Sequence, residues 1–460
     1  MSSVSGMGQV PRLTHPLVVS KRAPVKKVGN DMRARAILWA ASVLGLLGLS
    51  ALAGCALVFP SVSPVMSPIP ATPPVLAAFQ ESPAIASAQA WSENRVPVLK
   101  KAFEDNVYGF MPPRVSVNVL DRKDITSQVG LPGAIVEQWT LAFGSHDGAP
   151  KGNMILVVPN DGRDRHATLV MQNFCGNRAA LPGAPLAASF ITEPPKECYG
   201  QMSNMLIKAV LGEYASAPPW ADLIARHYAV AMLYAGDIVP DDAIASQPAL
   251  KALWALGGPE AATRQQTGAL AAWAWAYSRM VDVLSLDPRL NPKQIAIWGH
   301  SRNGKAALLA AATDPRIALV IAHQAGRGGS ALTRNDVGEP MAKLLENYPY
   351  WFAPAFKSFV GREVEIPVDQ HQLIAMIAPR PVLLGQGRED RWADPESAFR
   401  ALKGASPAYA LFGSKGLTQS EITTPDLDAD LAIFMRPGRH GGVAQDWQYF
   451  LGFMDQHLKP

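Results

Sequence analysis

The chain has 460 residues, of which 48% are hydrophobic and 17% charged, a balance that supplies a large core and excludes wholesale disorder. The formal net charge of +4 is small and much of the excess lies in the first 35 residues, so composition does not favour a nucleic-acid partner. Three cysteines exclude a disulfide-rich scaffold and a zinc site with four thiolates.

An uncharged apolar run over residues 37–59 follows Arg33 and Arg35. Its length suits a membrane-spanning helix or the hydrophobic region of a secretory signal. The run contains Leu52-Ala53-Gly54-Cys55, which has the form of a bacterial lipobox, where a peptidase cleaves before a cysteine that receives lipid. We expect residues 1–55 to be a lipoprotein-type signal with lipid on Cys55; an uncleaved inner-membrane anchor is the alternative.

Both a lipoprotein signal and an uncleaved anchor would export the rest of the chain. The residue after Cys55 is Ala56, not the Asp that tends to hold lipoproteins at the inner membrane. We therefore expect an outer-membrane lipoprotein that faces the periplasm or the cell surface. Met32 directly precedes Arg33, so translation could begin at Met1 or at Met32.

Export would leave Cys175 and Cys198 as the only cysteines in the body of the mature protein, beyond the lipidated Cys55. In an oxidising compartment they could pair, close a loop of about 24 residues and contribute about 3 kcal/mol. Two separate buried thiols are the alternative.

Residues 56–90 are rich in Pro, Ala and Ser and lack apolar periodicity, so we expect a flexible tether there. From residue 91 to 460, strand patterns alternate with helix patterns. The expected strands are 136–143, 154–158, 167–174, 229–234, 295–298, 318–322, 381–386 and 431–435. The expected helices are 219–226, 261–285, 305–312 and 446–458. This alternation predicts one α/β domain with a mainly parallel sheet, helices on both faces, and chemistry beyond the carboxyl ends of the strands.

Gly299-His300-Ser301 lies between the expected strand 295–298 and the helix 305–312. Strand, sharp turn and helix form the nucleophile-elbow pattern, in which a strained turn exposes the serine hydroxyl. Asn303 stands where a second glycine is usual, and Gly304 follows it. Ser301 is therefore the candidate nucleophile; a serine that only caps the helix is the alternative.

The residue types that such a serine needs follow two later strands. Glu389 and Asp390 come after strand 381–386, and His440 lies on a glycine-rich loop after strand 431–435. Neutral serine is a poor nucleophile, so a histidine must accept its proton and a carboxylate must stabilise the imidazolium. The order Ser, acid, His is that of the α/β-hydrolases, which predicts their three-layer sandwich fold.

Longer motifs surround these residues. They are GHSRNGKAALL (299–309), DPRIALVI (314–321), GRGGSAL (326–332), VDQH (368–371), APRP (378–381), EDRWADP (389–395), RPGRHG (436–441), NFCGN (173–177), YAGD (234–237) and AAWAW (271–275). Together, over about residues 95–460, they resemble the bacterial branch of the glucuronoyl esterases, carbohydrate esterase family 15.

The resemblance implies roles for single residues. Ser301 would be the nucleophile, His440 the base, and Arg302 would help to stabilise the oxyanion. Lys305 would hold hydroxyls of a glucuronate ring and Glu339 would accept hydrogen bonds from the same sugar. The aromatic wall of that pocket would be Trp392. Without the family, a solvated helix face, a loop charge and a core tryptophan are the alternatives for these last three residues.

One position departs from the family. Many members carry the catalytic Glu just after the strand that follows the nucleophile helix, and Gln324 stands there. An amide cannot carry the charge that supports imidazolium. Either the acid comes from the loop after strand 381–386, with Asp390 preferred and Glu389 in reserve, or the triad is incomplete and activity is weak or lost.

The resemblance implies hydrolysis of the ester between (4-O-methyl-)glucuronic acid of glucuronoxylan and a lignin-type alcohol, through a glucuronoyl-enzyme. An acetyl esterase acting on sugars, or a catalytically weakened glycan-binding homologue, is the alternative. We expect no metal and no organic cofactor, because positioned donors can hold the oxyanion. We expect a monomer whose contact with the membrane is its N-terminal lipid or anchor.

Overall fold

The computed structural model describes residues 71–458 apart from gaps at 146–147, 174, 182, 192–207, 209–210, 215, 259–266, 335–336 and 423. The expected lipidation site Cys55 and the start of the expected tether lie outside the described residues. Within the described part, no helix has the length and hydropathy needed to cross a membrane.

The described strands form one sheet in the order β1-β2-β3-β5-β4-β6-β7-β8-β9. Strands β1, β2, β3 and β5 pair antiparallel in succession, and the pairs from β5 through β4 to β9 are parallel. The bounds are β1 Val117–Asp124, β2 Ala134–Phe143, β3 Lys151–Pro159, β4 His166–Asn173, β5 Ala229–Tyr234, β6 Leu290–His300, β7 Leu319–His323, β8 Val382–Gly387 and β9 Leu431–Arg436. The mainly parallel sheet and all eight expected strands are confirmed.

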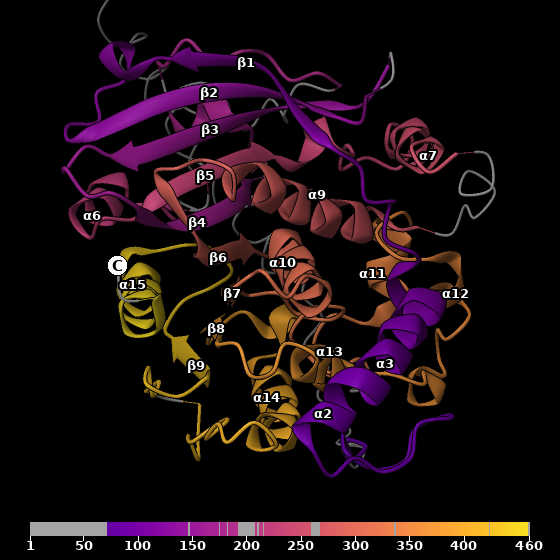
Figure 1. Cartoon of the computed structure of the whole chain (residues 1–460). Helices are drawn as coiled ribbons and strands as arrows, with labels where there is room; N and C mark the ends of the chain where they lie inside the picture. Colours follow the sequence, from indigo (N-terminus) through magenta and orange to yellow (C-terminus); the bar gives the residue numbers. More distant parts are fainter. Residues whose placement is uncertain are drawn as a thin grey trace, which may run out of the picture. The chain divides into compact units, whose positions relative to one another are not determined.

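Helices cover both faces of the sheet because side chains alternate between two apolar faces along each buried strand. On β3, Leu156 and Val158 join one core cluster, and Ile155 and Val157 join the other. Figure 1 shows α9, α10, α13 and α14 on one side and α6 and α15 on the other. These two clusters make the three-layer sandwich expected from the sequence.

The expected helices 219–226, 305–312 and 446–458 are found with bounds that differ by up to three residues, whereas the helix expected at 261–285 begins at Ala269, and residues 259–266 lie outside the described part. The helix bounds are α2 Ala88–Ala90, α3 Val96–Phe103, α4 Asn177–Ala180, α6 Trp220–Ala225, α7 Ser246–Ala255, α9 Ala269–Leu284, α10 Arg302–Thr313, α11 Met341–Asn347, α12 Pro354–Lys357, α13 Gln370–Ala375, α14 Pro395–Ala410 and α15 Ala444–Leu458. Almost every residue of α9 is buried, as is usual for a helix that is apolar on all sides.

The folded body begins earlier than the expected boundary at residue 91. Val75 is buried in the larger core cluster, and its carbonyl oxygen accepts a hydrogen bond of 2.7 Å from the buried guanidinium of Arg95. Nε2 of His371 lies 3.0 Å from the carbonyl oxygen of Pro73. Residues 71–90, expected to be tether, are therefore packed on the α/β domain through contacts that proline-rich composition does not reveal.

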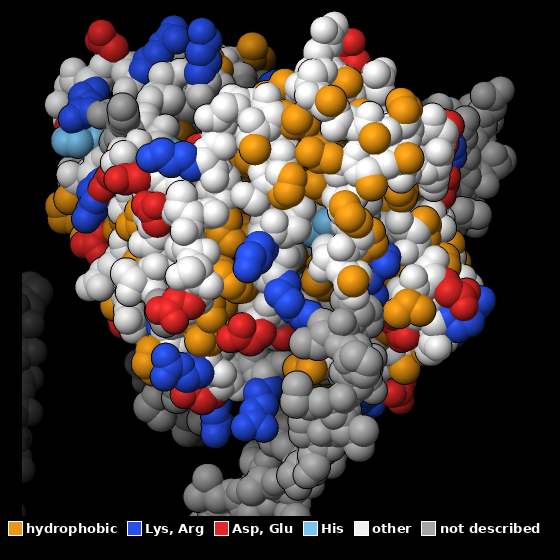
Figure 2. Space-filling model, turned by 90° about the horizontal axis from the view of Figure 1, so that it is seen from below, with side chains coloured by type: hydrophobic (Ala, Val, Ile, Leu, Met, Phe, Trp, Pro, Cys, Tyr) orange, Lys and Arg blue, Asp and Glu red, His pale blue; other side chains and the backbone are white. Residues whose placement is uncertain are grey.

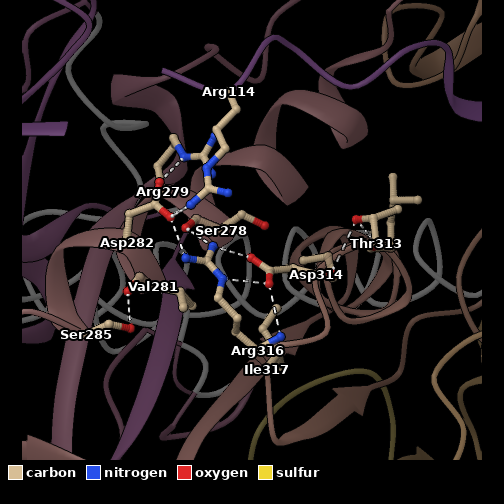
Figure 3. Close-up of polar contacts among 12 residues, drawn as sticks. Arg114, Ser278, Arg279, Val281, Asp282, Ser285, Thr313, Asp314, Arg316 and Ile317 are labelled. Carbon is tan, nitrogen blue, oxygen red and sulfur yellow. Dashed lines mark hydrogen bonds and ion pairs between the residues drawn. The ribbon is translucent and has the colours of Figure 1, made fainter. Parts of the chain in front are cut away.

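An ionic network ties the end of α9 to the turn between α10 and β7 (Figure 3). The Asp282 carboxylate forms ion pairs with Arg279 at 2.7 Å, with Arg316 at 2.5 Å and with Arg114 at 3.3 Å. Arg316 also pairs with Asp314 at 2.6 Å. One carboxylate therefore holds three guanidinium groups from three separate segments.

Charged side chains of both signs share the face seen in Figure 2. Lys and Arg lie beside Asp and Glu there, and hydrophobic side chains gather over the upper part of the same face. Among the described side chains, this face therefore carries no extended patch of a single sign.

Candidate active site

The turn between β6 and α10 has the geometry of a nucleophile elbow. Ser301 occupies it with φ 56° and ψ −123°, a strained conformation for a residue with a side chain. Its backbone N–H donates to the carbonyl oxygen of His323 on β7 at 2.8 Å. A Cβ on Gly299 would overlap the carbonyl of Asn303, and one on Gly304 would lie 2.8 Å from the carbonyl oxygen of Gly299. The close contact explains why glycines stand at positions 299 and 304.

The acid and the base reach this elbow from neighbouring strand ends. Asp390 follows β8 and His440 follows β9, and the sheet order places the carboxyl ends of β6 to β9 side by side. Nδ1 of His440 lies 2.6 Å from Oδ2 of Asp390. The His440 ring centroid is 4.6 Å from that of His300, the residue before Ser301. With Nδ1 on the carboxylate, Nε2 is the nitrogen left to accept the serine proton.

The two candidate acids differ in environment. Asp390 is buried, and its Oδ1 accepts from the backbone N–H of Ala393, which fixes the carboxylate in the turn. Glu389 is exposed, and its backbone N–H donates to Gly438. Among the described residues it is therefore Asp390 that contacts His440.

A buried ion pair that sequence reasoning missed supports the His440 loop. Arg436 donates to Asp446 at 2.8 Å and also to the carbonyl oxygens of Gly441 at 2.5 Å and Arg439 at 3.2 Å. Burial acts to raise the pKa of Asp446, but His323 and Arg436 lower it below its usual value. This charged pair thus anchors the backbone on both sides of the His440 imidazole. The signal for it in the sequence was an arginine at the end of an expected buried strand.

Arg302 follows the serine directly, and Asp241 fixes its side chain through an ion pair. The same carboxylate accepts from the Tyr350 hydroxyl at 2.6 Å and from Nε1 of Trp351 at 2.8 Å. The guanidinium also lies over the Trp351 ring, 4.9 Å from its centroid. Burial lowers the pKa of Arg302, although an arginine stays cationic at neutral pH. Sequence reasoning missed Asp241, Tyr350 and Trp351 as partners of this cation.

Lys305 is buried one helical turn beyond the serine. Its ammonium donates to the carbonyl oxygens of Ala325 and Arg327, each at 2.6 Å. Burial lowers the pKa of Lys305 to about 8, and the nearby Glu339 carboxylate opposes that shift. An ammonium has three N–H donors, so one N–H is left for another acceptor after these two hydrogen bonds are made.

Glu339 and Trp392 lie beside each other near Lys305. The Glu339 backbone N–H donates to the Trp392 carbonyl oxygen at 3.1 Å, and its own carbonyl accepts from Arg327 at 2.6 Å. Burial raises the pKa of Glu339, while the positive charges of Lys305 and its neighbours oppose the rise. The Trp392 side chain remains 45% exposed. The structure thus brings the Lys305 ammonium near the Glu339 carboxylate and places the backbone of Trp392, whose side chain is accessible, beside Glu339.

The expected disulfide is described at one end only. Cys175 is buried and disulfide-bonded. Cys198 lies outside the described residues, so its pairing with Cys175 stays a prediction. Among the described residues, no three or more His, Cys, Asp or Glu side chains gather in a way that could hold a metal ion.

A mainly parallel sheet with an elbow serine after β6, a carboxylate after β8 and a histidine after β9 defines the chain as an α/β-hydrolase. Comparisons with known proteins narrow this class. The family model described as "Glucuronyl esterase, fungi" matches residues 241–413. The carbohydrate esterase MZ0003, from an unknown prokaryotic organism, is 32% identical over 379 residues, which cover 81% of this chain and 87% of that protein.

Solved structures agree. A glucuronoyl esterase from Solibacter usitatus superposes with a TM-score of 0.72 at 28% identity, over 85% of this chain and 100% of that one. A promiscuous esterase of family 15 from a marine bacterial metagenome gives 0.70 at 28% identity, over 85% of this chain and 98% of that one. The chain therefore belongs to carbohydrate esterase family 15, the glucuronoyl esterases.

Shorter matches reach the fungal enzymes of the family. The 4-O-methyl-glucuronoyl methylesterase 1 of Wolfiporia cocos is 33% identical over 191 residues, which cover 40% of this chain and 46% of that protein. The chain thus spans about half the length of this fungal relative.

Proposed function

We propose that this chain is a serine esterase that hydrolyses the ester between (4-O-methyl-)glucuronic acid of glucuronoxylan and a lignin-type alcohol. The observation that carries the proposal is the 2.6 Å contact between His440 and Asp390 beside the strained Ser301 elbow. The fungal relatives named as 4-O-methyl-glucuronoyl methylesterases support the choice of acyl group.

In the first half-reaction, the Ser301 hydroxyl oxygen attacks the ester carbonyl while Nε2 of His440 takes its proton. Asp390 stabilises the imidazolium through Nδ1. The Arg302 guanidinium, held by Asp241, supplies positive charge to the oxyanion. When the intermediate collapses, the bond to the alcohol breaks, and His440 returns the proton to the departing oxygen. The product is a glucuronoyl ester on Ser301.

In the second half-reaction, water attacks that ester and His440 takes one of its protons. The second tetrahedral intermediate expels the Ser301 oxygen, which His440 reprotonates. Free glucuronate leaves and the enzyme returns to its starting state. Each step uses groups of the chain and water alone.

The acyl group is selected beside this machinery. A sugar ring carries hydroxyls that both donate and accept and has apolar faces. The third N–H of Lys305 suits a hydroxyl oxygen, the Glu339 carboxylate suits hydroxyl donors, and the exposed Trp392 indole suits a ring face. An acetyl group has neither hydroxyls nor a ring face for these three side chains to bind, which favours glucuronoyl over acetyl esters.

The test compares hydrolysis of benzyl glucuronate with that of an acetylated sugar by the full chain. We expect benzyl glucuronate to be preferred in kcat/KM, and Ser301→Ala to abolish its turnover. Preference for the acetyl ester would replace the proposal by acetyl esterase activity. Binding of glucuronate with no turnover above Ser301→Ala would replace it by glycan binding.

We also propose that the chain is an exported lipoprotein, anchored in the outer membrane through Cys55. The lipobox form of residues 52–55 after an uncharged apolar run supports this address. Labelled palmitate should appear on the wild-type chain and not on Cys55→Ser. Label-free wild-type protein that stays in the inner-membrane fraction would favour an uncleaved anchor.

A further inference from the structure

We propose that Gln324 is a positioning residue whose amide clamps the backbone on both sides of His440 and so holds the base against Ser301 and Asp390. The proposal rests on the proposed esterase function. It assigns a role to the residue that stands where many members of the family carry a glutamate.

The clamp consists of two hydrogen bonds from one side chain. Nε2 of Gln324 donates to the carbonyl oxygen of Arg439 at 3.1 Å, and Oε1 accepts from the backbone N–H of Gly441 at 2.7 Å. These two groups belong to the residues directly before and after His440. The side chain is buried, and the Gln324 backbone N–H donates to Gly385 on β8 at 2.8 Å. The loop is therefore bound to the sheet at both neighbours of the base.

The chemistry of the two backbone groups calls for an amide. A backbone carbonyl only accepts and a backbone N–H only donates, so the clamp needs one donor and one acceptor. An ionised glutamate offers only acceptors, and one of its oxygens would face the Arg439 carbonyl without a proton between them. Arg439 also accepts from Arg436 at 3.2 Å, whereas the amide oxygen of Gln324 is the partner described for the Gly441 N–H.

Close packing at the end of β8 supports the same assignment independently. A Cβ on Gly387 would lie 2.6 Å from Nε2 of Gln324, 2.7 Å from the Gly438 carbonyl oxygen and 2.9 Å from that of Arg439. Only a glycine leaves room for the amide and the His440 loop to meet there. The space at this strand end is thus shaped around the clamp.

The clamp separates two tasks that one glutamate would combine. Asp390 supplies the negative charge at Nδ1 of His440, at 2.6 Å. Gln324 carries no charge and fixes where the imidazole stands. A misplacement of a catalytic group by about 1 Å can cost about 10²-fold in rate, so loss of the clamp should reduce kcat without removing the triad.

The test uses Gln324→Leu, which removes both bonds, and Gln324→Glu, which keeps the shape and the acceptor. Gln386→Leu is the matched control, because Gln386 is buried on the neighbouring strand and neither of its amide atoms has a partner among the described residues. With benzyl glucuronate, we expect Gln324→Leu to lower kcat about 10²-fold with KM nearly unchanged. Gln386→Leu should keep both constants near those of the wild type.

Gln324→Glu adds a second readout, the pH dependence of kcat/KM. Its kcat should fall as well, and the acid limb of its kcat/KM profile should shift to higher pH, because a new negative charge near His440 favours the imidazolium. A wild-type kcat in folded Gln324→Leu would overturn the proposal. If Gln324→Leu does not fold, a wild-type kcat and acid limb in folded Gln324→Glu would overturn it instead.

The rate at which a fluorophosphonate labels Ser301 separates this proposal from the proposed substrate. The reagent reports how well His440 activates the serine and needs no sugar. If the wild type is labelled but does not hydrolyse benzyl glucuronate, the substrate is wrong while slower labelling of Gln324→Leu still supports the clamp. Equal labelling rates for the two proteins would dismiss the clamp.

Discussion

Oδ2 of Asp390 lies 2.6 Å from Nδ1 of His440 although 50 residues separate the two in the chain. Asp390 is buried at the end of β8, whereas the adjacent Glu389 is exposed. This contact supplies the carboxylate that Gln324 cannot supply from β7. It also makes the first prediction specific to one of two neighbouring acids.

Asp390→Asn should lower kcat for benzyl glucuronate by about 10⁴-fold, because an amide neither fixes the required imidazole tautomer nor stabilises the imidazolium. Glu389→Gln is the matched control and should leave kcat near the wild-type value. Steady-state kinetics of the two variants show whether Asp390 is the acid of the triad. Near-normal turnover by Asp390→Asn would remove this residue from the triad.

Asp241→Asn should reduce kcat by about 10- to 100-fold, the effect of losing one charge-assisted hydrogen bond of about 1.5–3 kcal/mol. The variant keeps an acceptor for Tyr350 and Trp351 but loses the charge that holds Arg302. Asp242→Asn serves as control, since this exposed neighbour only accepts from Ile244 and Ala245 backbone groups. Equal kinetics for both variants would show that Arg302 needs no fixed partner.

The KM for benzyl glucuronate should rise as the pH increases through about 8. Burial lowers the pKa of Lys305 to about 8, so the ammonium is protonated below that pH and becomes a neutral amine above it. The amine has lost both its charge and the N–H left over for a sugar hydroxyl. The KM for an acetyl ester, measured on the same enzyme, should stay flat over this range. A parallel rise for both esters would mean that Lys305 does not contact the sugar.

Asp282→Ala should lower the free energy of unfolding by about 3 kcal/mol, because it strands the buried guanidinium of Arg279. It also removes one ion-pair partner each from Arg316 and Arg114. Denaturant unfolding measures the change, and kcat/KM should remain near the wild-type value because the network lies away from the triad. Asp105→Ala breaks the exposed pair with Lys101 and should leave stability almost unchanged. Similar losses in both variants would contradict the importance of burial here.

Buried elements were predictable because their side chains follow the period of the structure they form. Strand β5 has the expected bounds Ala229–Tyr234, and every residue in it is buried. Strand β1 was missed because its residues after Val117 are exposed and its last four residues are all charged, so no apolar alternation marks it. The packed segment 71–90 was missed for a related reason: its partners, such as Arg95 and His371, act on backbone carbonyls and leave no pattern in its own sequence.

By itself, the sequence determined the α/β class, the serine at the elbow and the histidine near the C-terminus, because glycine spacing and strand periodicity are local properties. Tertiary structure alone decided that Asp390 rather than Glu389 meets His440, that Asp241 holds Arg302, and that the Gln324 amide spans the loop of the base. Those choices depend on distances between segments brought together by the sheet order. A spacing along the chain does not specify such distances, and a hydrogen bond forms only within about 3 Å.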